Sequence, residues 1–202
     1  MNKLLGPVFL ILPALTFAAP VTPINLLING SFEADVQATG TFSNPAMLTG
    51  WTGGPHGIEL RDNVAGSAYD GKNFIELEST ANSSMSQSFS TTIGQTYLLS
   101  FFYEQRPDNL GAASDGMSWS AGNMSDVAFG QDTISSWTQV NSSFVATGLT
   151  TTLTFKALGT SDSMGTSLDA VSVVSAVPEP ASYQLALLGL AACGVAARRR
   201  PR

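Results

Sequence analysis

The sequence offers few side chains for nucleophilic catalysis. His56 is the sole histidine, so a Ser-His-Asp arrangement would depend on it, yet it lies in "GGPHGIEL" with no nucleophile motif nearby. Cys193 is the sole cysteine and lies in an apolar stretch near the C-terminus. We therefore expect no catalytic residue and predict that the protein is not an enzyme.

Paired carboxylates are the second chemistry that the sequence could offer. Glu76 and Glu78 in "NFIELES" are two residues apart and would share one face of a strand. A glycan hydrolase would need such groups to face each other across a cleft. The alternative is a solvated strand face, because a chain with 15 acidic residues contains such pairs without any catalytic role.

Three tryptophans could stack on sugar rings. Trp51 and Trp137 fall in strand-like patterns, which favours the core. Trp119 lies in a polar segment, where a large ring either folds inward or faces a ligand. We take Trp119 as the leading ligand-binding candidate, with Tyr103 and Arg106 as planar and polar contacts.

The charge between the two ends of the chain is strongly negative. Residues 19–177 hold four basic and 14 acidic side chains, which gives a formal charge of −10. A nucleic acid or an anionic membrane surface requires a basic face, so this composition argues against nucleic acid as a partner. Neutral sugars and divalent cations are the partners that it favours.

Short strand-like segments fill the chain from residue 24 to residue 175. They are rich in β-branched and aromatic residues, and Gly, Asn, Ser, Asp and Pro separate them. In "TTLTFKAL", Leu153 and Phe155 alternate with Thr154 and Lys156, as in a strand with one buried face. This spacing predicts a single all-β domain with the architecture of a β-sandwich.

The segment from Arg106 to Ser136 breaks this rhythm. It is heavy in Gly, Ser, Asn and Asp, with short strands expected around Met117–Ser120 and Asp126–Phe129. Binding residues on a β scaffold concentrate in its loops. We therefore expect the ligand loops to lie in this segment.

The first residues have the layout of a secretory signal peptide. Lys3 precedes an apolar run from Leu4 to Leu15, and small residues follow. Cleavage after Ala18 would place Thr16 and Ala18 at the small-residue positions. We predict a leader over residues 1–18, with its apolar run as an N-terminal signal helix.

The C-terminal segment, residues 177–202, has three parts. It begins with a proline turn, continues as an apolar stretch that predicts a short transmembrane helix, and ends in a basic cluster. A short tail anchor or a buried helix is the alternative. The turn and the cluster consist of Val177, Pro178, Glu179, Pro180, Arg198, Arg199 and Arg200. The three parts in this order closely resemble the PEP-CTERM sorting signal of Gram-negative bacteria.

This resemblance implies a destination. It implies recognition by an exosortase, cleavage near the Pro-Glu-Pro sequence and transient insertion of the short helix in the inner membrane. Pro178 and Pro180 cannot continue a helix, so they hold Glu179 in an extended segment that a protease can bind. The mature protein would then reach the cell surface or the exopolysaccharide matrix.

The region between the two ends resembles a second family. The motifs "NLLINGSFEAD", "GWTGG", "AYDGKNFIELES", "SMSQSFSTTIGQTYLLSFFY", "TTLTFKALG" and "TSLDAVSVV" follow one another from about Asn25 to Val174. Their order resembles that of galactose-binding-like jelly rolls, which include the carbohydrate-binding modules of secreted glycanases. The resemblance implies a jelly-roll sandwich over residues 24–175 and a role in sugar binding.

The same resemblance implies a structural calcium ion where the first and last strands meet. Glu33 of "NGSFE" and Asp169 of "LDAV" match the carboxylate ligands, and the carbonyls around Asp70, Gly71 and Lys72 would join them. Calcium takes about six to eight oxygen ligands, which can be both carboxylate and backbone carbonyl oxygens. The alternative is that both carboxylates are surface or turn residues.

We therefore expect an exported, non-catalytic binding protein directed to the cell surface or matrix. Its expected partner is exopolysaccharide or another surface glycan. One alternative is a structural or adhesive matrix protein that binds other proteins. A third class, the glycan hydrolases, would require activity from His56 or a carboxylate pair.

Overall fold

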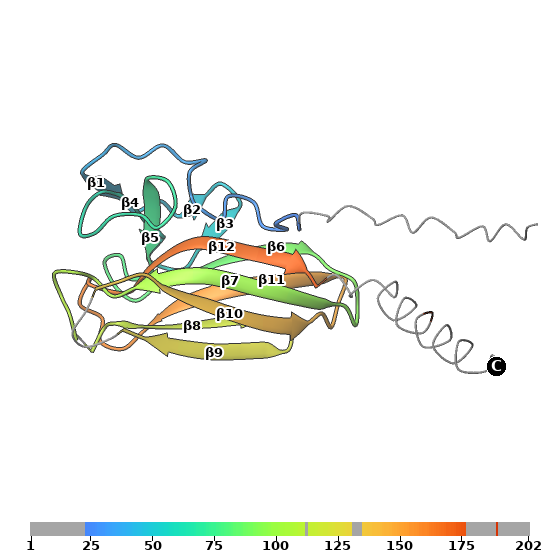
Figure 1. The fold of residues 1–202 in the computed structure, drawn as a ribbon. Helices are drawn as coiled ribbons and strands as arrows, with labels where there is room; N and C mark the ends of the chain where they lie inside the picture. The colour runs from blue at the N-terminus through green and yellow to red at the C-terminus, as the bar shows by residue number, and fades with distance from the viewer. Residues whose placement is uncertain (1–22, 112, 131–134, 177–188, 190–202) are drawn as a thin grey trace, which may run out of the picture.

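Two antiparallel six-stranded sheets pack face to face in the computed structural model (Figure 1). The structure describes residues 23–111, 113–130, 135–176 and 189. The prediction of an all-β sandwich is confirmed. The signal helix expected in residues 1–18 and nearly all of the expected C-terminal helix lie outside the described residues. Within the described ranges, no helix has the length and hydropathy needed to span a membrane.

The first sheet, sheet A, holds the chain's last strand near its middle. Its spatial order is β1-β4-β5-β12-β7-β10, and every neighbouring pair is antiparallel. The strands span Thr41–Ser43 (β1), Glu59–Asp62 (β4), Asn73–Glu76 (β5), Ser167–Ser175 (β12), Thr96–Glu104 (β7) and Thr138–Val145 (β10).

The second sheet, sheet B, combines two early hairpin strands with four longer ones. Its order is β2-β3-β6-β11-β8-β9. The strands span Met47–Leu48 (β2), Trp51–Gly53 (β3), Ser84–Ser90 (β6), Thr150–Leu158 (β11), Gly116–Ala121 (β8) and Met124–Phe129 (β9). The strands expected near residues 117–120 and 126–129 are therefore confirmed, as the hairpin β8-β9.

Strand β11 shows why these sequences form half-buried strands. Leu153 and Phe155 are buried, whereas Thr152 and Lys156 are exposed on the opposite face. Side chains of successive strand residues point to opposite faces, so the period-two pattern places Leu153, Phe155 and Ala157 between the sheets. The buried face predicted from the sequence is confirmed.

Aromatic rings join the two sheets at the centre of the core. Phe101 of sheet A meets Phe155 of sheet B edge-on at 5.1 Å between ring centroids, and it meets Trp119 at 5.0 Å. Trp51 lies 6.4 Å from Phe155 and is 1% exposed, which confirms its predicted place in the core. Edge-to-face pairs at these distances are favourable beyond the area they bury.

The segment before β1 is fastened to β12. The Asn25 carboxamide donates to the Val171 carbonyl at 3.0 Å and accepts from the Val173 N–H at 2.9 Å. The Val171 N–H donates to the Gly30 carbonyl at 2.8 Å. A register shift in β12 between Asp169 and Ser172 accompanies these contacts. The beginning and the end of the domain therefore meet beside one bulge.

We predict that Phe155→Ala lowers the free energy of unfolding by about 3–5 kcal/mol, because it leaves a cavity beside the rings of Trp51 and Phe101. The neighbouring variant Thr154→Ala, on the opposite face, should change it by about 0.5 kcal/mol or less. Urea denaturation of both variants measures the difference. Equal losses would show that the ring cluster is not the centre of stability.

Candidate functional site

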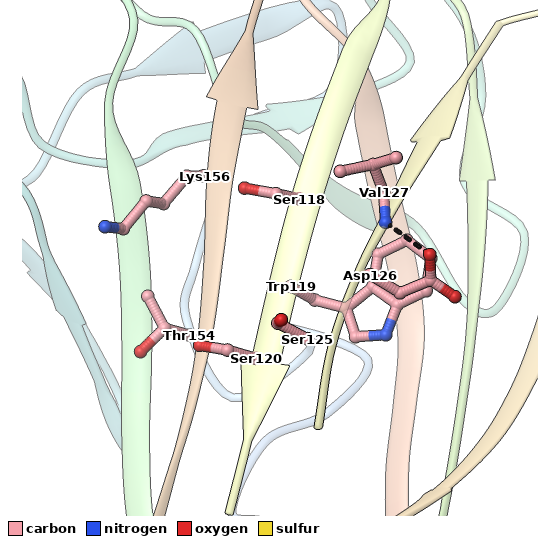
Figure 2. A pocket seen from close by; sticks show the side chains of 8 residues that line it. All are labelled: Ser118, Trp119, Ser120, Ser125, Asp126, Val127, Thr154 and Lys156. Carbon is pink, nitrogen blue, oxygen red and sulfur yellow. Dashed lines mark hydrogen bonds between the residues drawn. The ribbon is translucent and has the colours of Figure 1, made fainter. Parts of the chain in front are cut away.

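The outer face of sheet B carries an open hollow of about 460 Å³ (Figure 2). Strands β8, β9 and β11 form it, and most of the lining side chains face away from the core, whereas Trp119 and its cross-strand partner Asp126 lie on the inner face of the sheet. Ser118, Ser120, Ser125, Asp126, Val127, Thr154 and Lys156 line it, together with Trp119. Half of the lining residues thus carry hydroxyl groups, with one cation and one carboxylate beside them.

The hydroxyl groups form a row that crosses the sheet. Cross-strand partners in register are Thr52 and Ser86, Ser86 and Thr154, Thr154 and Ser120, and Ser120 and Ser125. Figure 2 shows the last three side chains in line across β11, β8 and β9. At ~4.8 Å between strands, a row over five strands is about 19 Å long.

A row of this kind suits a ligand that also carries many hydroxyl groups. Each Ser or Thr hydroxyl both donates and accepts a hydrogen bond, so it can pair with a sugar hydroxyl in either sense. Lys156 adds three donors at one end of the hollow. Asp126 Oδ1 accepts from the Val127 N–H at 2.8 Å, which fixes that carboxylate at the β9 edge.

The structure corrects the predicted roles of Trp119 and Tyr103. Trp119 is 4% exposed because its strand position points into the core, where its ring packs edge-on against Phe101. Tyr103 is 8% exposed, and its hydroxyl donates to the Phe129 carbonyl at 3.3 Å. Neither ring offers a face to a sugar, so neither is a stacking platform.

Arg106 lies at a different place, on the outer side of sheet A. Its Nε donates to Asp108 Oδ1 at 2.7 Å, and its Nη1 donates to the Ser163 carbonyl at 3.1 Å. Nη1 also lies 3.6 Å from Glu76 Oε1. The structure therefore does not bring Arg106 together with Trp119, and these two predicted ligand residues belong to separate sites.

Glu76 and Glu78 are both buried, so the alternative prediction of a solvated strand face is wrong for this pair. Loops over the outer face of sheet A cover both side chains, which are 0% exposed. Arg61 lies between carboxylates, with Nη2 at 2.6 Å from Glu59 Oε1 and Nη1 at 2.6 Å from Glu76 Oε2. The pair thus belongs to a covered polar layer.

Burial sets the protonation of this layer. Burial raises the pKa of the Glu76 carboxyl to about 8, and the guanidinium of Arg61 and the N–H of Gly165 lower it only in part. Glu104 of β7 has a pKa raised by burial as well, with a hydrogen bond from Ser135 that lowers it. A neutral Glu76 can donate a hydrogen bond as well as accept one.

The residues predicted to hold calcium do meet, at one turn. Asp169 Oδ2 accepts from the N–H groups of Tyr69 and Asp70 at 2.8 and 2.9 Å. Glu33 Oε1 accepts from the N–H groups of Lys72 and Asn73 at 2.8 and 2.7 Å. Two distant carboxylates thus hold residues 69–73 from both sides.

At this turn, the carboxylates of Glu33 and Asp169 mainly accept hydrogen bonds from backbone N–H groups. Burial raises the pKa of Asp169 to about 7, although three backbone N–H groups lower it, and the charge of Asp70 raises it further. Across the described ranges, no group of three or more His, Cys, Asp or Glu side chains is placed to hold a metal ion. An ion here would therefore depend on backbone carbonyls for most of its ligands.

The hydroxyl row is not apparent from the sequence alone. Its signal was present, because Ser84, Ser86, Ser88 and Ser90 alternate with apolar or amide residues in "SMSQSFS". A single strand shows only that these residues face outward. The cross-strand register is needed to place Ser86 beside Thr154 and to turn separate outward residues into one row.

Comparison with known proteins identifies the C-terminus. A protein-family model described as the PEP-CTERM protein-sorting motif matches residues 176–200. The match covers residues 177–200 of the sorting signal predicted over residues 177–202. This chain therefore carries that C-terminal sorting motif, which indicates an exported protein. A search of curated protein sequences finds no match.

Solved structures with a similar fold differ widely in sequence. The arabinose-bound α-L-arabinofuranosidase MgGH51 matches at 14% identity with a TM-score of 0.52, over 75% of this chain and 26% of that one. The module TmCBM61, solved with beta-1,4-galactotriose, matches at 15% identity and a TM-score of 0.48, over 75% of this chain and 98% of that module. The CBM22-1 xylan-binding domain from Paenibacillus barcinonensis Xyn10C matches at 15% identity and a TM-score of 0.42, over 71% of this chain and the whole of that domain.

We predict that the folded domain loses stability as the pH rises from about 4.5 to about 8. The folded-state pKa of Glu76 lies above its ordinary value of 4.5, so its contribution is complete below pH 4.5 and is lost as the pH passes about 8. Glu76→Gln, which is neutral at every pH, should flatten this slope. Chemical denaturation at pH 5 and pH 8.5 tests it, and an unchanged slope would contradict the assignment to Glu76.

Proposed function

We propose that this protein is an exported, non-catalytic carbohydrate-binding protein that holds a glycan on the outer face of sheet B. One observation carries the proposal: the in-register hydroxyl row Thr52, Ser86, Thr154, Ser120 and Ser125, with the hollow at its β11-β8-β9 end. A glycan chain that crosses the strands along this row would meet a hydroxyl group at every strand.

The charge of the domain favours a neutral glycan. Residues 19–177 carry a formal charge of −10, which opposes an anionic polymer. Lys156 is the one cation among the residues that line the hollow, and Asp126 lies in the same lining. The site itself therefore has no surplus positive charge to attract a uronate or a phosphate.

The sorting motif and the sandwich support a role outside the cell. We take the fold as a jelly roll of the galactose-binding type, with its C-terminal segment processed by an exosortase after transient insertion in the inner membrane. The mature protein would then act at the surface of a Gram-negative bacterium, with exopolysaccharide as its glycan. The matched motif at residues 176–200 supports the sorting, and the hydroxyl row supports the ligand.

We also propose a structural calcium ion at the turn over residues 69–73. Glu33 and Asp169 reach this turn from the first and last parts of the domain, and backbone carbonyls of the turn would supply the remaining ligands. A cavity of about 220 Å³ opens beside it, lined by Asp70 and by residues of β12 and the first segment. The ion would neutralise this acidic turn and fix the bulge of β12.

We predict that the purified protein binds a neutral polysaccharide and that removing hydroxyl groups from the row weakens this binding. Thr154→Val combined with Ser120→Ala should reduce affinity about tenfold, because each lost hydrogen bond costs about 0.5–1.5 kcal/mol. Affinity electrophoresis against a panel of soluble polysaccharides, followed by calorimetry on the best ligand, measures the change.

Ser143→Ala is the matched control, because Ser143 is an exposed hydroxyl on β10 of the other sheet. This variant should bind as the unmodified protein does. If the polysaccharide retards the double variant as strongly as the unmodified protein, the hollow is excluded as the glycan-binding site. Self-association or capture of surface proteins without any glycan affinity would favour a structural matrix protein instead.

We predict that calcium raises the melting temperature and that a chelator reverses the effect. At a calcium concentration 100 times Kd the stabilisation is about 2.7 kcal/mol. Asp169→Asn should abolish the response to calcium, whereas Asp126→Asn, on the far sheet, should retain it. A melting temperature that changes with neither calcium nor chelator would exclude a structural ion.

A further inference from the structure

We infer that a second pocket, on the outer side of sheet A, binds a single neutral sugar residue at the end of a glycan chain. The inference rests on the proposed carbohydrate-binding function and adds a separate site to it. The pocket has a volume of about 280 Å³. It is lined by Phe42, Asn44, Glu59, Arg61, Val64, Ala65, Ser79, Thr80, Arg106 and Ser163.

Two arginines that line this pocket, Arg61 and Arg106, are held in place by carboxyl groups. The Arg61 side chain is 3% exposed, and its Nε donates to Glu59 Oε1 at 2.7 Å. Its Nη1 meets Glu76 Oε2 at 2.6 Å, and Arg106 reaches the other oxygen of Glu76 at 3.6 Å. Ion pairs buried in this way hold donors and acceptors in place before a ligand arrives.

The rim of the pocket contains strained backbone. Ala65 has φ of +50° and Ser163 has φ of +66°, and both line the pocket. Non-glycine residues in this region are held there by their surroundings, and such residues gather at ligand clamps. Ser163 is held by two contacts, since its N–H donates to Glu78 Oε1 at 2.8 Å and its carbonyl accepts from Arg106 at 3.1 Å.

The lining of the pocket combines apolar and polar side chains, and a sugar ring requires both. Phe42, 55% exposed, and Val64 form an apolar side. Asn44, Glu59 and Arg61 add acceptors and donors to the same lining. A pyranose or furanose ring also has an apolar face of C–H groups and a rim of hydroxyl groups. A volume below the ~300–1,000 Å³ of drug-sized pockets limits the ligand to about one ring.

The charges select a neutral ring. Each arginine is already paired, Arg61 with Glu59 and Glu76, and Arg106 with Asp108. The pocket therefore has no surplus cation for a phosphate or a carboxylate. A neutral polyol can instead share these groups by donating to a carboxylate and accepting from a guanidinium.

NMR titration of the purified protein with methyl glycosides of the common neutral hexoses and pentoses tests the inference. At least one should bind, and Phe42→Ala and Asn44→Ala should each weaken it about three- to tenfold. Phe129→Ala is the matched control, because Phe129 is 59% exposed on β9 and does not line this pocket. Thermal melting should show that all three variants remain folded.

The outcomes separate this site from the hollow on sheet B. Methyl glycoside binding that survives Thr154→Val with Ser120→Ala but not Phe42→Ala supports the inference. Methyl glycoside binding that survives Phe42→Ala but is lost in the double variant Thr154→Val, Ser120→Ala would overturn the inference. It would place the sugar ring in the hollow on sheet B. Polysaccharide binding without any methyl glycoside binding would overturn it and leave the proposed function standing. Binding of D-galacturonate or inorganic phosphate alone would overturn the choice of a neutral ligand.

Discussion

The edge-to-face contact of Phe101 with Phe155 and Trp119 is the interaction on which the sandwich depends. It joins β7 of one sheet to β11 and β8 of the other, at distances of 5.1 and 5.0 Å. Because strand residues alternate, fixing Phe155 and Trp119 inward forces Thr154 and Ser120 outward. The packing of the core therefore decides which side chains the outer face of sheet B presents. A one-residue change of register would bury the hydroxyl row and expose the rings.

The outer face of sheet A differs from the core because it buries charged side chains. There, several of the buried side chains are charged, and Arg61 contacts both Glu59 and Glu76. Taking charges out of water costs more than their attraction returns unless further hydrogen bonds satisfy them. The N–H of Gly165 supplies one at 2.9 Å, and protonation of Glu76 removes part of the remaining cost. Such a layer is weak support for stability and is better explained by the need to place polar groups at a pocket.

Destination and binding are encoded in separate parts of this chain. The sorting motif at residues 176–200 is local, so a family model matches it without any knowledge of the fold. The proposed binding surface on sheet B is assembled from strands far apart in the sequence, with Thr52 and Ser125 at the two ends of one row.

The sequence by itself determined the all-β architecture, the half-buried strand at Leu153 and Phe155, the core place of Trp51 and the sorting motif. These features depend on period-two alternation or on adjacent residues, which a linear sequence displays directly. Only the tertiary structure decided that Trp119 points inward, that Glu76 is buried, and that hydroxyl groups of five strands align. The direction of a side chain and its cross-strand neighbours depend on pairing between distant segments, and pairing is set by how the two sheets pack.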